Sequence, residues 1–351
     1  MPTPLSIILP AHNQATELRQ HLPLILEQDF EEFEVIVVDI ASTDETKDVL
    51  EGLELQYTQL RHTHTPASAR DISLEWLALT LGVRAAKHEW VVLSRADCQP
   101  ASTQWLQHIS AAATEEKSIL LGIAKYEEHR HTWFDQKVAF FRLWTTLANL
   151  RHVQAGNSAV RADECNVAIR RTLFLGQENF GTNLNLLTGA VELMVNHLSN
   201  AGNTGIVTEP EALVIQDSLP SKRLWMKHRV FYMETRRHLR NTGLYRLKQD
   251  LRMAFPWLLL AAVVAIWPAV IYFQVPQTLP LWILLGLVGL LLLIILIYKS
   301  ISFNAAARSI GYERRFYLSL PWLALALPLW NANAWLRYRF TPKNEFRKKF
   351  V

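Results

Sequence analysis

Features that would indicate several protein classes are missing from this sequence of 351 residues. Only two cysteines are present, Cys98 and Cys165, so a disulfide framework is excluded and a reducing cytosol is the expected environment. There is no internal repeat and no low-complexity tract, which excludes a repeat architecture. The N-terminus leads directly into a polar loop and a strand pattern, and we therefore expect no signal peptide.

Charged side chains are absent from Ala254 to Tyr298. This stretch predicts two membrane spans, at residues 254–273 and 279–298, because each has the roughly 20 apolar residues that cross a bilayer as a helix. A buried helical hairpin in a soluble core is the alternative. We disfavour it because so long an uncharged, leucine-rich run is rare in soluble domains.

Lysine and arginine residues flank the uncharged stretch on both sides. By the positive-inside rule both flanks lie in the cytoplasm, which predicts a multi-pass protein of the inner (cell) membrane with residues 1–253 in the cytoplasm. A basic cytosolic tail is expected at 341–351. The flanking residues are Arg246, Lys248 and Arg252 before the spans, and Lys299, Arg308, Arg314 and Arg315 after them.

A third apolar segment, 316–336, completes a predicted membrane region of residues 254–340. A third crossing would place the basic tail outside, whereas a re-entrant or interfacial segment would keep both ends inside. We favour the second arrangement, because prolines and amides at membrane depth need protein or water partners. The segment contains Pro321, Pro328, Asn331 and Asn333.

The segment before the spans, 221–253, is strongly basic. It holds ten lysine and arginine residues, with Trp225, Phe231 and Tyr232 interleaved. This pattern predicts an amphipathic helix at the membrane surface, with lipids as partners and aromatic side chains in the interface. Nucleic-acid binding is the other interpretation, and we reject it because the adjoining spans already place the segment at a membrane.

Residues 1–220 alternate between strand and helix patterns. Such alternation is typical of an α/β domain in which helices cover a mostly parallel sheet. The expected strands are Leu5–Leu9, Val35–Val38, Tyr57–Leu60, Trp90–Leu93 and Ile119–Gly122, and the expected helices are Ala15–Glu27, Thr43–Leu50, Ser73–Ala86 and Ser102–Ala113.

Three of these strands run into polar loops, at SIILPAHN, VIVVDIASTDET and WVVLSRADCQP. The loops carry Asn13, Asp39 and Asp97. Because the carboxyl ends of parallel strands line one edge of an open sheet, where such sheets bind ligands, these side chains are expected in one crevice.

The segments PAHN, VVDIASTDET and RADCQP, in this order and spacing, resemble the membrane-bound family-2 glycosyltransferases. The segments LTLGVRAAKHEWVVL, CNVAIRRTLF and LLTGAVELMVNH extend the resemblance over residues 4–240. It implies the GT-A fold followed by C-terminal transmembrane helices. The implied enzyme is a hexosyltransferase that moves a sugar from a cytosolic UDP- or GDP-linked donor to a lipid-linked or membrane-proximal acceptor, in cell-envelope polysaccharide or glycolipid synthesis.

The resemblance also implies roles for individual residues. The loop with Pro10, Ala11 and Asn13, and the carboxylate of Asp39, would hold the nucleoside, because a carboxylate accepts hydrogen bonds from ring N–H groups and ribose hydroxyls. Asp97 would be a ligand of the Mn²⁺ or Mg²⁺ ion that carries the diphosphate of the donor.

Position 95 departs from the family's Asp-x-Asp metal loop, because Arg95 stands where the first acid is expected. A fixed positive charge opposes a bound cation, yet a guanidinium binds phosphate in a bidentate way. Three interpretations stay open. Arg95 replaces the metal at the diphosphate, or it marks a site that no longer needs one, or it is a solvent-facing residue paired with Asp97.

The base segment departs from the family as well. Gly189 is followed by Ala190 and Val191 instead of acids, so the resemblance leaves Glu192 as the replacement general base. The other departures are Ile40 in place of a second Asp, Glu75-Trp76 in place of a basic pair, and His228–Tyr232 in place of Gln-x-x-Arg-Trp.

Two functional hypotheses follow. The first is an active glycosyltransferase. The second is a catalytically inactive pseudo-glycosyltransferase that acts as a binding or assembly subunit, beside an active glycosyltransferase or another envelope-synthesis partner. A salt bridge from Arg95 to Asp97 that fills the pocket would favour the second hypothesis, and a common open crevice for Asp97 and Glu192 would favour the first.

Overall fold

The computed structural model describes residues 2–65, 73–127, 132–176, 185–217, 219–272 and 279–347. The chain divides into two units. The N-terminal unit comprises Met1–Asn241 together with Ala334–Val351. The helical unit comprises Thr242–Asn333.

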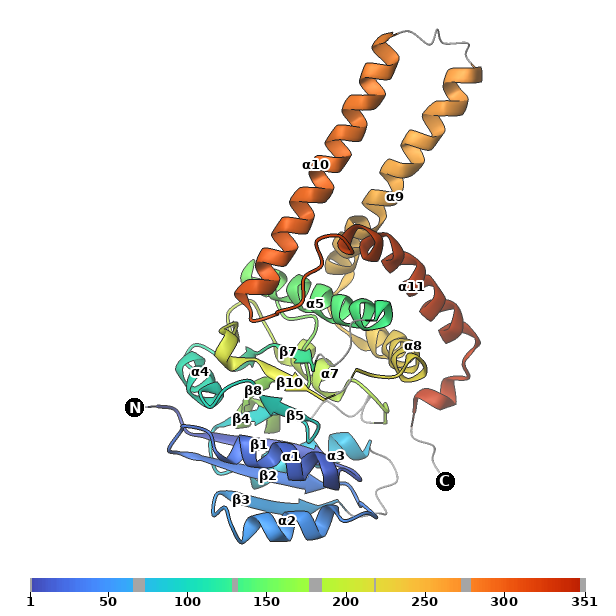
Figure 1. Ribbon diagram of the computed structural model, residues 1–351. Coiled ribbons are helices and arrows are strands. Elements are labelled where there is room, and N and C mark those ends of the chain that lie inside the picture. Colours follow the sequence, from blue (N-terminus) through green and yellow to red (C-terminus); the bar gives the residue numbers. More distant parts are fainter. Residues whose placement is uncertain are drawn as a thin grey trace. The chain divides into compact units, whose positions relative to one another are not determined.

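In the described part of the N-terminal unit, the main sheet has seven strands in the order β3-β2-β1-β4-β8-β6-β9 (Figure 1). Strands β1 to β4 are parallel to one another, as are β6 and β9, and β8 is antiparallel to both its neighbours. The predicted α/β fold with a mostly parallel sheet is thereby confirmed. The strands are β1 (Leu5–Ala11), β2 (Phe33–Asp39), β3 (Leu60–His64), β4 (Trp90–Leu93), β6 (Ile119–Leu121), β8 (Val167–Arg170) and β9 (Thr204–Ile206).

A small second sheet pairs β10 with β5 in the antiparallel sense and with β7 in the parallel sense. It brings the loop after β4 next to a segment much later in the chain, because the Asp217 amide donates a hydrogen bond to the Asp97 carbonyl (2.8 Å). The strands are β5 (Cys98–Pro100), β7 (Ala124–Tyr126) and β10 (Val214–Gln216).

Helices of the N-terminal unit connect and cover these strands. They are α1 (Ala15–Leu26), α2 (Thr46–Glu54), α3 (Leu74–Ala85), α4 (Trp105–Ala112), α5 (Trp133–Gln154), α6 (Arg171–Leu175), α7 (Ala190–Leu198) and α8 (Lys222–His238), with short 3₁₀ turns at Pro210–Ala212 and Lys343–Phe346.

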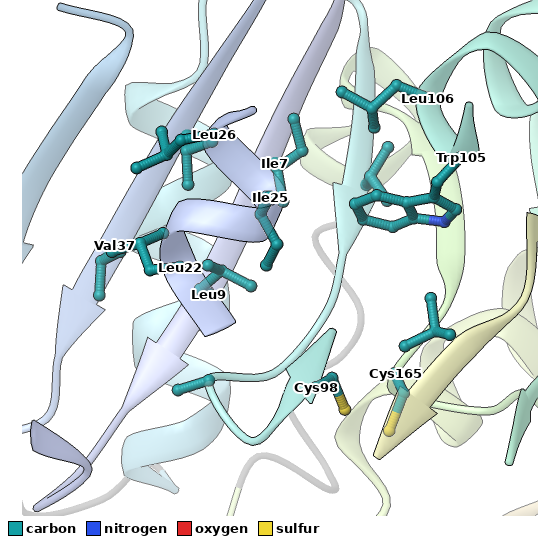
Figure 2. Packing of buried hydrophobic residues seen from close by; sticks show 14 of the residues in the cluster. Ile7, Leu9, Leu22, Ile25, Leu26, Val37, Cys98, Trp105, Leu106 and Cys165 are labelled. Atoms are coloured by element: carbon teal, nitrogen blue, oxygen red, sulfur yellow. The ribbon is translucent and has the colours of Figure 1, made fainter. Parts of the chain in front are cut away.

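The central strands β1, β2 and β4 are buried along almost their whole length, which explains why their residues are nearly all apolar. On one face of β1, Ile7 belongs to the same core cluster as Leu22 and Ile25 of α1 (Figure 2). On the other face, Ile8 lies directly against Gly82 of α3. Helices therefore cover both faces of the sheet.

Most predicted elements lie within a few residues of the observed ones, but the strand predicted at Tyr57–Leu60 is wrong. These residues form the turn after α2, in which the Tyr57 amide donates to Leu53 and the Leu60 amide donates to Tyr57. The strand β3 begins only at Leu60. The reason is that α2 extends to Glu54, beyond the predicted end of the helix at Leu50, and displaces the strand.

The helical unit contains α9 (Gly243–Tyr272), α10 (Leu279–Ser309) and most of α11 (Leu320–Phe340). Among the described residues, one helical stretch, Gly289–Ser309 in α10, is long and apolar enough to cross a membrane. It overlaps the predicted span 279–298. Residues 254–272 of the other predicted span are helical, but most of their side chains are not among those that the structure describes.

One expectation about membrane contacts is corrected. Trp225 of α8 does not face outward, because it is 5% exposed and packs edge-on against Phe134 and Phe141 of α5. The segment expected as a basic cytosolic tail, 341–351, contains Phe346, which is 2% exposed and therefore belongs to the core of the N-terminal unit. No helix was predicted at α5 from the sequence, so Trp225 had no visible partner.

Gly82 offers a test of the packing of α3 on the sheet. A Cβ atom there would lie 2.3 Å from the Ile8 side chain, so we expect Gly82→Ala to destabilise the protein by about 1–3 kcal/mol. Gly52 is the matched control, because a Cβ atom on this α2 residue meets no other atom within 4 Å. Gly52→Ala should be stabilising by up to about 1 kcal/mol. Thermal unfolding of the full chain in detergent measures both; equal midpoints for the two variants would contradict this packing.

Candidate active site

The loops that follow β1 and β2 lie side by side and are tied together by hydrogen bonds. Ala11 and Asp39, the last residues of the two strands, are partners in the sheet register. The Asn13 amide donates to Ser42 Oγ (2.9 Å), and Asn13 Oδ1 accepts from the Thr43 amide (2.8 Å). Asp39 Oδ1 accepts from the Ser42 amide (3.0 Å). The predicted nucleoside residues are thus brought together at one edge of the sheet.

Backbone conformation shapes the same edge. Asn13 and Ala41 have positive φ angles of 51° and 48°, in the left-handed region that non-glycine residues seldom adopt. The Ala11 carbonyl, which follows Pro10, accepts from the Ile40 amide (2.7 Å). These two sharp turns keep both loops close to the strand ends.

The loop after β4 is organised around the guanidinium of Arg95. Its Nε donates to Asp97 Oδ1 (2.8 Å), its Nη2 contacts Asp97 Oδ2 (3.4 Å), and its Nη1 donates to Glu164 Oε1 (2.8 Å). The expected pairing of Arg95 with Asp97 is present. The Arg95 side chain is 36% exposed, so it lies partly in solvent and partly against its two carboxylate partners.

The second oxygen of Asp97 also has a protein partner, because Gln216 Nε2 donates to Oδ2 (2.9 Å). Gln216 in turn accepts from Arg142 Nη1 (2.8 Å), and Arg142 makes a two-pronged ion pair with Asp163 (2.8 and 2.9 Å). A continuous network therefore joins the loop after β4 to the segment before β8.

The donor set does not fit a divalent cation as the side chains stand. Both carboxylate oxygens of Asp97 are engaged, and the positive guanidinium of Arg95 lies between Asp97 and Glu164. Metal ions of this kind need several free oxygen ligands. Consistently, no cluster of three His, Cys, Asp or Glu side chains with metal-binding geometry occurs among the described residues.

Charges in this cluster shift one another's proton affinity. Burial alone would raise the pKa of Asp97, but Arg95 outweighs it and holds this pKa below its ordinary value. The pKa of Glu75, in the first turn of α3, is shifted upward instead. Burial and then the charge of Glu164 raise this pKa to about 7, although Arg95 opposes the shift. Glu75 is therefore about half protonated near neutral pH.

Glu164 and the electrostatic role of Glu75 were not predicted from the sequence. Glu164 immediately precedes the segment that resembles the acceptor side of the family, but no pattern links it to Arg95. Glu75 was noted only as a departure. A carboxylate that lies 69 residues from its cation in the sequence leaves no spacing signal.

Glu192, the predicted general base, lies in a buried ion pair. It is 8% exposed, and Arg161 Nε donates to its Oε1 (2.8 Å). The guanidinium of Arg161 lies over the ring of Tyr232 on α8 (4.4 Å). Burial raises the pKa of Glu192 despite the opposing charge of Arg161. Glu192 and Asp97 therefore each bond to a different arginine.

Within the segment His228–Tyr232, Arg229 packs between aromatic rings of α5 and α8. The Arg229 guanidinium lies over the rings of Phe141 (4.1 Å) and Trp225 (4.9 Å), and the residue is 5% exposed. Burial, followed by the charge of Arg161, lowers the pKa of Arg229 to about 10. This arginine fastens α8 to α5.

Residues 6–174 match the family model for glycosyl transferase family 2. Over these residues, the chain is similar to that family. Three features of a GT-A glycosyltransferase domain are present in it: the mostly parallel sheet, the polar loops after β1 and β2, and the short loop after β4.

A solved structure supports the GT-A fold of these residues. The mannosyltransferase PcManGT from Pyrobaculum calidifontis, in complex with GDP-Man and Mn²⁺, has 17% identity and a TM-score of 0.57, covering 97% of this chain and 89% of that chain. TarS 1–349 from S. aureus, in complex with UDP-GlcNAc, has 18% identity and a TM-score of 0.47, covering 64% of this chain and 61% of that chain. No curated protein matches this chain.

The carboxyl group of Glu75 predicts a pH dependence of stability. Its pKa is about 7 in the fold against an ordinary value of 4.5, so the fold favours the protonated form. The stabilisation is complete below pH 4.5 and is lost as the pH rises through 7. Glu75→Gln mimics the protonated acid. Its free energy of unfolding relative to the wild type should therefore be higher at pH 8 than at pH 5, by on the order of 1–2 kcal/mol.

Unfolding midpoints at pH 5, 6, 7 and 8 measure this effect. Glu51→Gln, on the exposed surface of α2, is the control and should run parallel to the wild type. A constant difference between Glu75→Gln and the wild type across this range would contradict the assignment.

Proposed function

We propose that this family-2 glycosyltransferase transfers a sugar from a UDP- or GDP-linked donor and holds the donor's diphosphate with Arg95 instead of a metal ion. The observation that carries the proposal is the position of the Arg95 guanidinium at the end of β4, next to the loops after β1 and β2. The fold neighbour PcManGT, which was solved with GDP-Man and Mn²⁺, supports the nucleotide-sugar class of donor.

In this proposal the loops after β1 and β2 hold the nucleoside, through Asn13, Asp39 and the backbone at Pro10 and Ala11. Arg95 exchanges its partners when the donor binds. A diphosphate takes the place of Glu164 on the guanidinium, because a planar fork of N–H donors matches phosphate oxygens as well as it matches a carboxylate. Asp97 keeps the arginine oriented through its bond to Nε.

Two carboxylates are candidates for the base that acts on the acceptor. Glu192 is buried and bonded to Arg161, whereas the Glu164 side chain is 39% exposed and is released when Arg95 turns to the diphosphate. A general base must come within hydrogen-bond reach of the proton that it takes. Glu164 meets this requirement better than Glu192, and we propose it as the base.

The acceptor is proposed to be lipid-linked or membrane-proximal, with the protein anchored in the inner membrane and the N-terminal unit in the cytoplasm. Support comes from the apolar stretch Gly289–Ser309 and from the side chains around α10, which leave more than half of their surface exposed. A broad helix face of exposed leucine and isoleucine needs apolar surroundings. These residues are Leu287, Leu290, Leu291, Leu293, Ile294 and Ile301.

A second candidate function is a binding or assembly subunit without transferase activity. The specific observation in its favour is that ion pairs occupy both parts of the site, Arg95 with Asp97 and Glu164, and Arg161 with Glu192. In this second case the donor pocket would bind nucleotide without turnover, or would not bind it at all.

Donor binding is tested by calorimetry of the full chain in detergent with UDP, GDP and their sugar conjugates. We expect binding in the presence of EDTA, no gain with Mn²⁺, and at least about a tenfold loss of affinity in Arg95→Ala, since bonds to charged groups contribute roughly 1.5–3 kcal/mol. Arg19→Ala, which removes an exposed ion pair with Glu45, should bind as the wild type does. Binding that requires Mn²⁺ would contradict the role of Arg95, and no binding in either condition would rule out a donor site.

Turnover separates the enzyme from the binding subunit. Release of nucleotide from radiolabelled UDP- and GDP-sugars is measured with the full chain in native membrane vesicles. We expect Glu164→Gln to lower turnover by about 10²-fold or more, as for loss of a general base, and Glu192→Gln to have a smaller effect. Binding without turnover in the wild type would select the subunit hypothesis; equal losses in the two variants would argue against Glu164 as the base.

A further inference from the structure

The last residues of α11 and those after it return to the N-terminal unit, and we call residues 334–347 the C-terminal strap. Its anchor is Phe346, which is 2% exposed. The Phe346 ring meets the ring of Phe231 on α8 edge-on (5.2 Å between centroids) and also packs against the ring of Tyr338 (5.3 Å). Burial of an aromatic ring against two others makes the strap a part of the core.

Backbone pairing extends the contact to the loop that precedes α7. The Leu187 amide donates to the Phe346 carbonyl (3.1 Å), and Leu186 forms an antiparallel bridge with Arg347. The strap therefore adds a short strand to the loop at residues 185–189, although the two segments lie far apart in the chain.

Polar contacts hold the strap to α8 as well. Tyr338 Oη donates to Glu234 Oε2 (2.5 Å) and accepts from Arg237 Nη1 (2.8 Å). Glu234 is 7% exposed, so this carboxylate is largely shielded from water. Hydrogen bonds to a buried charge are among the stronger ones in a protein.

The loop at 185–189 is held from its other side by α8. Thr235 Oγ1 donates to the Thr188 carbonyl (3.2 Å). Gly189 has a φ of 84°, and a Cβ atom there would lie 2.4 Å from the Thr235 side chain. Only glycine fits this close approach in this conformation. The loop thus lies between the strap and α8, and it leads directly into α7.

These contacts continue to the charged groups of the site. Phe231, which packs on Phe346, precedes Tyr232 on α8. The ring of Tyr232 lies under the guanidinium of Arg161 (4.4 Å), and Arg161 is bonded to Glu192 on α7 (2.8 Å). Both ends of this path, the loop at 185–189 and Tyr232, lie beside the Arg161–Glu192 pair, in the segment that resembles the family's base segment, and we call this region the acceptor side of the site.

We propose that the C-terminal strap positions the acceptor side of the site, with Phe346 as the positioning residue. The strap fixes the loop at 185–189 and the turn of α8 that carries Tyr232, and it thereby fixes Arg161 and Glu192. An effect of the strap on catalysis rests on the proposed function, whereas its effect on the position of these residues does not. The nucleoside loops after β1 and β2 are held by their own bonds among Asn13, Ser42 and Asp39 and should not respond.

Hydrogen–deuterium exchange on the full chain in detergent tests the positioning. In the wild type, local opening of residues 186–198 has to break the contacts with the strap. Phe346→Ala removes these contacts and lowers the free energy of opening, so the amides of residues 186–198 should exchange at least about tenfold faster. Amides of β1 and β2 should keep their rates, and UDP or GDP should bind with unchanged affinity. Phe340→Ala is the matched control, since Phe340 lies in the same segment and is 85% exposed.

Tyr338→Phe serves as a second variant if Phe346→Ala unfolds. It keeps the ring against Phe346 and removes only the hydroxyl bonds to Glu234 and Arg237, so a smaller acceleration confined to residues 186–198 is expected. Unchanged exchange there in both variants would overturn the inference, as would equal acceleration in β1 and β2. The exchange measurement does not depend on transferase activity. A protein without transferase activity would therefore refute the proposed function but leave the positioning by the strap intact.

Discussion

The guanidinium of Arg95 keeps two carboxylates together at the end of β4 that would otherwise repel each other. Asp97 and Glu164 both bond to it, and the charge of Glu75 responds to it. At short range in a partly dehydrated site, such charge interactions exceed those on an exposed surface several-fold. The network through Gln216 and Arg142 to Asp163 continues from this point and joins the loop after β4 to the segment before β8.

The ion pairs near α7 and β8 obey the same constraint with different residues. Arg161 with Glu192 and Arg142 with Asp163 are ion pairs withdrawn from water, and a buried pair persists only where its remaining hydrogen bonds and its geometry are well satisfied. Tyr232 under Arg161 and Gln216 beside Arg142 provide that support. The GT-A fold of this chain thus carries arginine–carboxylate pairs at these positions.

Much of the fold could be predicted from the sequence, because its signals are local. The apolar runs of β1, β2 and β4, and the polar residues that end them, are enough to predict that Asn13, Asp39 and Asp97 lie at one edge of the sheet. Prediction failed where the partner lies elsewhere in the chain. Trp225 reads as an interfacial aromatic residue until α5 covers it, and the tail reads as a solvated basic segment until Phe346 enters the core.

The sequence by itself determined the fold class, the strand-end residues and the presence of an arginine where the resemblance leads one to expect an acid. The tertiary structure decided what that arginine does. Arg95 and Glu164 are 69 residues apart in the chain, and Asp97 and Gln216 are 119 apart. Charge pairing depends on distance in space, and β8 and β10 set this distance by pairing with strands that precede them in the chain.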